Sequence, residues 1–529
     1  ENIDRIEVIR GPGGTVWGAN AVNGVINIIT KSSRDTQGGL VTAGTGSREN
    51  LQGTVQYGGK IGDKGAYRAF GSYTNAEPAR LETGVEGADG AHGSQGGFRS
   101  DWALSANDTL TVQGDLLQNA GGQTVTSVIA SQLPQVRTFN DRIAVAAGDI
   151  QTEYNHTLKN GSDLTLLTYF DRVHRNDLGD SVEQKVSTEL RYHFQIHPRH
   201  DFVAGAGYLL TDDSLTGLTA GFFAPDHRRD NLFSAFLQDQ IELTHSLALT
   251  LGTKVEHNAF TGLEYEPSAQ LVWTPVDRQA VWFSAARAIR QPAPLDENVH
   301  VEAAVVPLAN DSFGVVELSG NPDLRAETVR DFELGYRNQL HRKISLDVST
   351  FFSNYTDLRT TEPGVPYFSL TPGPPHLVIP ETWGNLARAR NHGAEVSMTL
   401  DVTSRWRLTP GFSLLHMNLT PDRASGDSTV AGTPGYSPKH QAQLRSSVKL
   451  GHHLDWDTSA YFVGVLSNGP VPAYTRLDTH LGWTMGESTY FSISGQNLLT
   501  PHHLEFLNGS LVQPTQVERS VVGKVTWRF

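Results

Sequence analysis

Apolar and polar side chains alternate along most of the chain, from about residue 38 to residue 529. Segments of about ten residues show this alternation and are separated by turn residues, which is the pattern of strands in a transmembrane β-barrel. Successive side chains of a strand point to opposite faces, so one face of the last strand suits lipid. That face holds Val521, Gly523, Val525, Trp527 and Phe529. The opposite face suits water and holds Val522, Lys524, Thr526 and Arg528.

The same alternation recurs in residues 247–256 and 476–485, where charged side chains lie on the predicted inner face. A large soluble β-protein alternates in the same way, because one face of each sheet packs against its core. Alternation alone therefore leaves the choice between a membrane barrel and a soluble β-protein open. The connections between the strands decide it.

Ten tight turns are predicted where small and polar residues interrupt the alternation. They lie at residues 62–65, 106–109, 160–163, 197–200, 244–246, 275–278, 340–343, 402–405, 451–454 and 486–489. Two strands and a usually longer connection separate successive turns, as at 119–145, 213–229, 290–327, 358–384 and 419–436. Short turns on one side and long loops on the other are typical of a membrane barrel.

Ten turns, with the first and last strands added, predict about 22 strands, a size at which the lumen of a barrel is plugged. The connections 290–327 and 358–384 are rich in Pro, Gly and apolar residues. We expect them to fold over the mouth of the barrel, because long structured loops are commonly functional.

Composition excludes several classes of protein. No stretch approaches the roughly 18 uninterrupted apolar residues that a membrane-spanning helix needs. The formal charge is -14 and both signs are interspersed, whereas a nucleic-acid binder needs clustered cations. The chain has no Cys, which excludes disulfides and thiolate metal sites. Motifs of the G-x-S-x-G and H-E-x-x-H types and propeller-like repeats are not found in the sequence, which argues against an enzyme and a soluble propeller.

The first 31 residues form a distinct segment. A strand ends at Arg10, and the sequence Gly-Pro-Gly-Gly at 11–14 predicts a turn with positive φ. A short turn around Trp17 and Gly18 follows, and then an apolar strand over 22–30. A phosphate-binding loop is excluded, because the segment lacks the Gly-Lys-Ser/Thr ending and no βαβ unit follows. The chain opens inside this alternation without a signal peptide, which is typical of an N-terminally truncated fragment.

Residues 6–31 closely resemble the end of the plug domain in TonB-dependent outer-membrane receptors. Further segments resemble the barrel of that family and occur in the family's order, at 289–292, 321–336, 385–395 and 495–499. The resemblance covers essentially the whole chain. It implies an all-β fold, a transmembrane antiparallel β-barrel of about 22 strands with the C-terminal fragment of an internal plug. Residues 1–36 would be the C-terminal part of the plug domain and residues 37–529 the barrel with long extracellular loops, while the TonB-contacting segment would precede Glu1.

The resemblance also implies a function, that of a receptor in the bacterial outer membrane that imports a scarce nutrient by energy-coupled rearrangement of the plug. A ferric siderophore is the expected ligand, and a haem or cobalamin receptor of the same family or a passive porin are the alternatives. The implied partners are a TonB-type energy-coupling protein, outer-membrane lipid and the barrel assembly machinery. We expect a monomer without a cofactor and without a nucleic-acid partner.

Charge pairs hold the plug to the barrel in this family. The resemblance therefore implies that Arg10, together with Glu7, faces inward-pointing groups of the barrel, for which Glu333 and Glu395 are the candidates. A carboxylate and a guanidinium in a confined lumen form a directional pair that mechanical work breaks. The alternative is that these residues are ordinary solvated charges of the lumen.

Candidate ligand-binding residues lie in the long connections. His300 has a position similar to that of an axial ligand in haem receptors, although a solvated loop histidine is the alternative. Tyr367, Phe368 and Trp383 are candidates for stacking on a planar or catecholate ligand, or for packing the loop onto itself. The aromatic chain end, with Trp527 and Phe529, is expected to be the signal for the barrel assembly machinery. The histidine pairs near 197–200, 452–453 and 502–503 lack metal-ligand spacing.

Overall fold

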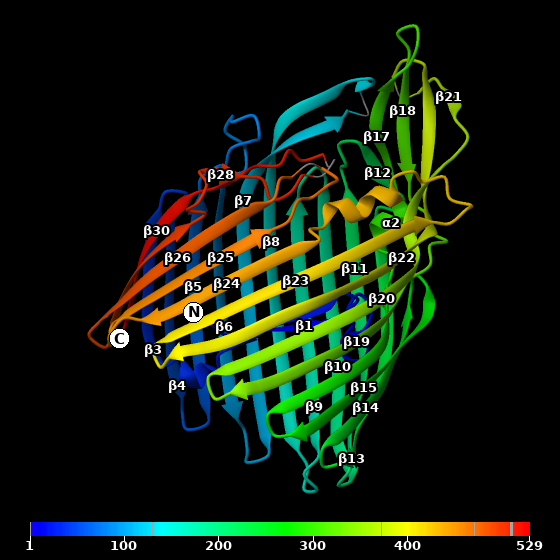
Figure 1. The fold of residues 1–529 in the computed structure, drawn as a ribbon. Helices are drawn as coiled ribbons and strands as arrows, with labels where there is room; N and C mark the ends of the chain where they lie inside the picture. Colours follow the sequence, from blue (N-terminus) through cyan, green and yellow to red (C-terminus); the bar gives the residue numbers. More distant parts are fainter. Residues whose placement is uncertain (1, 130–131, 372, 470, 508–510) are drawn as a thin grey trace.

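The computed structural model describes residues 2–129, 132–371, 373–469, 471–507 and 511–529. Within them, twenty-two strands close into an antiparallel barrel, as predicted (Figure 1). Eleven form the first half: β3 (Gly38–Gly46), β4 (Glu49–Ile61), β5 (Gly65–Ala76), β6 (Ala91–Ala103), β7 (Asp108–Val128), β8 (Val136–Thr157), β9 (Asp163–Asn176), β10 (Asp180–His197), β11 (His200–Thr216), β13 (His227–Thr244) and β14 (Leu247–Asn258).

The second half consists of β15 (Gly262–Val276), β16 (Gln279–Arg290), β19 (Glu327–His341), β20 (Ile344–Pro363), β22 (His376–Thr403), β23 (Trp406–Pro421), β24 (His440–Lys449), β25 (Leu454–Val463), β26 (Tyr474–Met485), β27 (Thr489–Gln496) and β30 (Ser520–Arg528). The last strand, β30, pairs with both β27 and β3 and so closes the ring. Closure matters because it satisfies every backbone donor and acceptor of the wall where no water is available.

All ten predicted tight turns join consecutive barrel strands, so that prediction is confirmed. Gly62 and Gly451 adopt φ values of +57° and +84° in two of these turns. A side chain is strained at such values, which explains why glycine stands there.

The predicted alternation is also confirmed. In β30, Val521 and Trp527 are 43% and 48% exposed on the outer face, while Val522 and Thr526 are 8% and 3% exposed on the inner face. Apolar side chains on the outside meet lipid, and the lumen receives the polar ones. Among the described residues, no helix has the length and hydropathy needed to cross a membrane.

The long connections are more regular than the sequence predicts. β7 and β8 extend through most of 119–145 and leave only 129–135 between them, so the prediction of a long loop there is wrong. The others hold short elements: β12 (Gly221–Phe223), α2 (Pro294–Asn298), β17 (Val299–Pro307), β18 (Phe313–Ser319), β21 (Tyr367–Ser369) and η3 (Val430–Tyr436). The reason is that backbone groups in such long connections find partners in one another.

The short strands among these elements extend the barrel sheet above the rim. β17 pairs with β12 and β18, while β22 pairs in parallel with β18 and antiparallel with β21. Figure 1 shows β17, β18 and β21 rising above the rim on one side of the barrel, rather than lying across its mouth as expected. The connection 497–519 carries the small ladder of β28 (His502–His503) and β29 (Val517–Glu518).

The N-terminal segment lies inside the barrel (Figure 1). β1 (Ile3–Arg10) and β2 (Gly24–Thr30) form an antiparallel ladder that is separate from the barrel sheet. Between them lies the helical turn α1 (Gly14–Trp17), and η1 (Ser33–Asp35) follows β2. The sequence placed the start of the second strand at residue 22 and a simple turn near Trp17. Pairing with β1 begins only at Gly24, because Gly18 and Asn20 adopt positive φ values of 80° and 75°.

Candidate functional site in the barrel lumen

The turn α1 is held against the inner wall by polar contacts. The Thr15 hydroxyl oxygen lies 2.9 Å from the carbonyl oxygen of Glu266 in β15. The Ala19 N–H donates to the Glu256 carboxylate of β14 at 3.0 Å. Glu266 and Glu256 are only 1% and 4% exposed. The bond from Ala19 to the buried Glu256 carboxylate is the stronger of the two, because hydrogen bonds to charged groups are stronger than those between neutral groups.

Glycine permits this close approach. A Cβ atom on Gly14 would lie 2.1 Å from the Glu266 carboxylate, and one on Gly18 would lie 2.2 Å from the Glu256 carboxylate. The wall carboxylates thus occupy the space that larger residues would fill. The sequence pattern Gly-Pro-Gly-Gly predicted a turn but gave no sign that the same glycines admit the wall.

A second attachment of the segment to the wall lies at Asn20, shortly after α1. The Asn20 N–H donates to the Ile289 carbonyl at the end of β16 at 2.7 Å, and the Gln291 N–H donates to the Asn20 side chain at 3.2 Å. A third attachment lies where the segment leaves the lumen. There the N–H and the hydroxyl of Ser33 both donate to Asp101 in β6 at 2.7 Å.

The predicted charge pair between the segment and the wall joins two of its four candidates. Arg10 forms an ion pair with Glu395 of β22. Glu7 is placed differently, since its carboxylate accepts from Arg5 at 2.7 Å and from Asn27 at 3.1 Å. Both partners belong to the β1–β2 ladder, and Arg5 shares a strand face with Glu7 because side chains repeat every second residue.

Glu333 remains on the wall near the Gly11 turn. Its carboxylate accepts from the Trp282 indole N–H at 2.8 Å, across the β16–β19 pair. A Cβ atom on Gly11 would lie 3.8 Å from it. The predicted cluster therefore splits into an ion pair at Glu395 and a neighbouring, wall-bound carboxylate at Glu333.

A cavity of about 890 Å³ lies above residues 20–24 of the segment. Its wall comes from the strand ends opposite the tight turns, on the side of the long connections. The Tyr355 hydroxyl of β20 donates to Asn23 at 2.7 Å and ties the floor of the cavity to the wall. Six charged side chains line it: Glu183, Lys185, Asp213, Asp230, Arg290 and Glu327. Its position gives it access from the outer side of the membrane, so it is the candidate ligand site.

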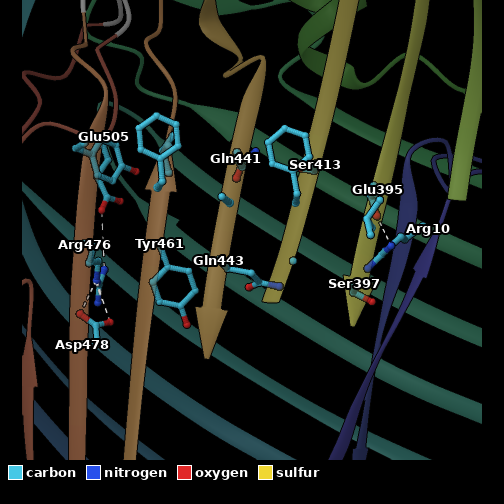
Figure 2. Close-up of a pocket in the computed structure, with 17 residues that line it drawn as sticks. Arg10, Glu395, Ser397, Ser413, Gln441, Gln443, Tyr461, Arg476, Asp478 and Glu505 are labelled. Carbon is cyan, nitrogen blue, oxygen red and sulfur yellow. Dashed lines mark hydrogen bonds and ion pairs between the residues drawn. The ribbon is translucent and has the colours of Figure 1, made fainter. Parts of the chain in front are cut away.

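A second lumen cavity of about 580 Å³ lies between the segment and strands β22 to β26. Figure 2 shows the Arg10–Glu395 pair at one end and Arg476 with Asp478 at the other, with glutamine, serine and tyrosine side chains between them. Arg476 donates to Asp478 at 2.9 Å, and Glu505 lies 3.9 Å from Arg476. Apolar side chains such as Phe412 and Phe462 line the cavity beside these polar ones.

The turn α2 borders the larger cavity and is fixed by a buried carboxylate. Asp296 accepts from Arg290 at 3.1 Å and from the Ala293 N–H at 3.0 Å, and it also pairs with Arg359. Burial on its own would raise the pKa of Asp296, but these donors outweigh it and hold the pKa below its ordinary value. Burial raises the pKa of the adjacent Glu297 in spite of its ion pair with Arg228.

The structure places the predicted ligand-binding residues apart from one another. His300 in β17 stacks on Phe222 at a ring distance of 4.9 Å. Tyr367 and Phe368 in β21 are exposed above the rim. Trp383 in β22 lies under the Arg359 guanidinium at 4.3 Å. None of these four residues lines either of the two lumen cavities described above.

The chain end lies at the barrel seam. The rings of Trp527 and Phe529 stack at a centroid distance of 4.4 Å. The Phe529 ring fills the space beside Gly39, where a Cβ atom would lie 2.2 Å from it. Over the ranges that the structure describes, no group of three or more His, Asp or Glu side chains has the arrangement of a metal site.

The charged residues of the larger cavity were not among the predicted site residues. Strand alternation places Glu183, Lys185 and Asp213 on the inner face, and this signal was available in the sequence. Which inner faces meet residues 20–24 depends on long-range packing that alternation does not encode.

A family model described as TonB dependent receptor-like, beta-barrel, matches residues 30–498. The chain belongs to the TonB-dependent receptor family. It is accordingly an outer-membrane β-barrel receptor and a transport protein rather than an enzyme. Membership also implies a TonB-type energy-coupling partner.

Two relatives of this TonB-dependent receptor match nearly the whole chain at low identity, and a third matches a short part of it at higher identity. The iron-regulated outer membrane virulence protein of Vibrio cholerae is 24% identical over 523 residues, which cover 94% of this chain and 76% of that protein. The ferric enterobactin receptor PirA of Pseudomonas aeruginosa is 23% identical, covering 93% and 73%. The vitamin B12 transporter BtuB of Vibrio cholerae is 40% identical over 103 residues, which cover 19% of this chain and 16% of that protein.

Solved structures agree with the fold. The siderophore receptor PirA from Acinetobacter baumannii superposes with a TM-score of 0.78 at 17% identity, over 100% of this chain and 85% of that one. A mutant ferric enterobactin receptor, PfeA, from Pseudomonas aeruginosa in complex with enterobactin also gives 0.78, at 16% identity, over 100% and 86%. At such identities the likeness establishes the architecture of the receptor.

Proposed function

We propose that this receptor binds a ferric siderophore from outside the cell and imports it by energy-coupled rearrangement of its N-terminal segment. In this proposal, residues 1–36 are the C-terminal part of a plug domain and residues 37–529 are the barrel. The observation that carries the proposal is the cavity of about 890 Å³ on the side of the long connections, floored by residues 20–24. A ligand in it contacts the lumen segment and the wall together.

The position of the lumen segment argues against the function of a passive porin. α1, Asn20 and Ser33 each hydrogen-bond the wall, so the segment occupies the lumen as a bound element. Passage requires some of these contacts to break, and a TonB-type partner would supply the work. Ligand binding contributes direction if the ligand has different affinities for the two arrangements of the segment.

The names of the full-length relatives support iron as the cargo, since they are an iron-regulated protein and a ferric enterobactin receptor. A haem receptor gains less support, because His300 is stacked on Phe222 above the rim, outside the cavity. The match to a vitamin B12 transporter spans only 19% of this chain and supports shared local structure more than a shared ligand.

Equilibrium binding to the full chain in detergent micelles tests the proposal. The probes are ferric siderophores of several classes, haem and cobalamin, with binding followed by quenching of intrinsic tryptophan fluorescence. We expect saturable binding of at least one ferric siderophore, and expression that rises when iron is scarce. Binding of haem or cobalamin alone, or no binding together with iron-independent expression, would refute the siderophore assignment.

A further inference from the structure

Both cations of the larger cavity are already neutralised by carboxylates of the wall. Lys185 pairs with Glu183, two residues earlier on β10. Arg290 donates two parallel hydrogen bonds to Glu327, at 2.9 Å and 3.0 Å, and a further one to Asp296. A cation that is already paired with a carboxylate attracts a ligand anion only weakly, because the neighbouring negative charge offsets its own.

The lining then carries an excess of negative charge. Two cations face four carboxylates, namely Glu183, Asp213, Asp230 and Glu327. Asp230 forms an ion pair with Arg228, and Arg228 forms a second ion pair with Glu297. Lys185 and Arg290 are the cations among the described lining residues, so the carboxylates of the lining are in surplus.

Asp213 has an unusual cross-strand neighbour. It lies directly opposite Glu183 in the β10–β11 pair and opposite Arg228 in the β11–β13 pair, and Arg228 is itself paired with Asp230 and Glu297. Like charges in directly opposed positions destabilise a sheet. Among the described residues, no hydrogen bond or ion pair engages the Asp213 carboxylate, which lines the cavity. A positive group placed in the cavity would relieve this repulsion.

The other lumen cavities have the same sign. Arg10 and Arg476 face Glu395, Asp478 and Glu505 in the cavity of Figure 2. A third cavity sets Arg10 and Arg337 against Asp331, Glu333 and Asp347, and a fourth sets Arg10 against Asp331, Glu333 and Glu395. The fourth adjoins the larger cavity through shared lining residues, among them Val22, Asn23 and Tyr355. The surplus of carboxylates therefore continues through the lumen.

We propose that the receptor selects ferric chelates by charge, preferring those that carry a positive group and rejecting the trianionic tris-catecholate class. This inference rests on the proposed function. Attraction draws a cationic ligand toward the cavity, and the net negative charge of the lining disfavours an anionic one by repulsion and desolvation. The class differs from the enterobactin held by the related PfeA structure, to which this chain is 16% identical.

Three iron complexes test the inference on the full chain in detergent. The first is a ferric trihydroxamate that carries one protonated amine, the second is its N-acetylated neutral form, and the third is ferric enterobactin. We expect affinity to fall in that order. We also expect added salt to weaken binding of the cationic complex and to leave the neutral one nearly unchanged, because screening acts on charge alone.

Asp213→Asn supplies the matched variant. Removing one carboxylate at roughly 8 Å from a bound cation lowers the affinity for the cationic complex by roughly 3- to 10-fold and leaves that for the neutral complex unchanged. The control is Asp277→Asn, which makes the same charge change in an exposed turn at the opposite end of the barrel. If Asp213→Asn fails to fold, the salt dependence of the unaltered chain decides the question.

The outcomes separate the two proposals. If ferric enterobactin binds most tightly, or if affinity follows neither ligand charge nor salt, the charge selection is wrong while the siderophore function stands. If no ferric complex binds, the proposed function itself fails.

Discussion

At the scale of single residues, the backbone of the lumen segment packs directly against buried carboxylates of the barrel wall. Gly14 and Gly18 lie where any side chain would collide with Glu266 and Glu256. The sequence predicted these glycines as turn residues, and it predicted the partnership of Arg10 with the barrel through resemblance. It did not predict the buried glutamates, because inward orientation on a strand says nothing about what lies opposite in the lumen.

Gly14→Ala should loosen the segment. The added methyl group meets the Glu266 carboxylate at 2.1 Å, so α1 must shift away from the wall. Such overpacking costs about 1–3 kcal/mol. Hydrogen exchange of residues 13–21 in detergent should speed up correspondingly. Gly71→Ala in β5 is the control, since the space around its Cβ position is open. Equal protection of 13–21 in Gly14→Ala and the unaltered chain would show that α1 is not docked as described.

The Arg10–Glu395 pair should contribute little to stability. Arg10 is 58% and Glu395 33% exposed, and ion pairs open to water are worth about 0.2–1 kcal/mol. A double-mutant cycle of Arg10→Ala and Glu395→Gln, read by exchange of β1, should give a coupling energy in that range. The same cycle with Glu7→Gln in place of Arg10→Ala should give none. A coupling of several kcal/mol would mean that the pair is shielded from water.

At the scale of elements, the barrel wall was predictable from the sequence, and the extension of its sheet above the rim was not. Turn residues and a period of two recur along the chain, so the sequence located all ten tight turns and the strand number. The short strands β12, β17, β18 and β21 gain their partners from distant connections. Their pairing depends on tertiary contacts that a local pattern does not record. The same holds for α2, which is fixed by Arg290 and Arg359.

Acid should release α2. A carboxyl group whose pKa is depressed in the folded state stabilises it above the unfolded pKa, and this stability is lost as the pH falls through the folded pKa. The pKa of Asp296 is depressed. A nitroxide on Ala309→Cys, a unique cysteine in this chain, reports the motion of the β17–β18 connection. Its mobility should stay constant from pH 7 to about 5 and rise below about pH 4.

Asp296→Asn should produce the mobile spectrum already at neutral pH, because a neutral amide no longer holds the two guanidinium groups. Asp277→Asn, in a turn far from α2, should leave the label unchanged. A label that is equally rigid in Asp296→Asn would show that other contacts fix α2.

At the scale of the whole molecule, a closed wall surrounds a segment that must move for anything to pass. The lumen cavities adjoin one another along that segment: the fourth shares Arg10 with the cavity of Figure 2, and it shares Val22 and Asn23 with the larger cavity. The proposed ligand cavity and the segment that obstructs the lumen therefore lie within one continuous region. The barrel and the lumen segment were both predictable from the sequence, but only their packing shows that the segment lines the proposed ligand cavity.

Locking the segment to the wall tests this account most directly. The hydroxyl oxygens of Thr15 and Ser268 lie 2.8 Å apart, and the chain has no other cysteine to compete, so Thr15→Cys with Ser268→Cys forms a unique disulfide under oxidation. The measurement is uptake of a bound radioactive ferric siderophore by iron-starved cells that express the receptor. The account predicts unchanged ligand binding, lost uptake in the oxidised form and recovery on reduction, with Thr15→Cys alone unaffected. Equal uptake by the oxidised and reduced forms would contradict it.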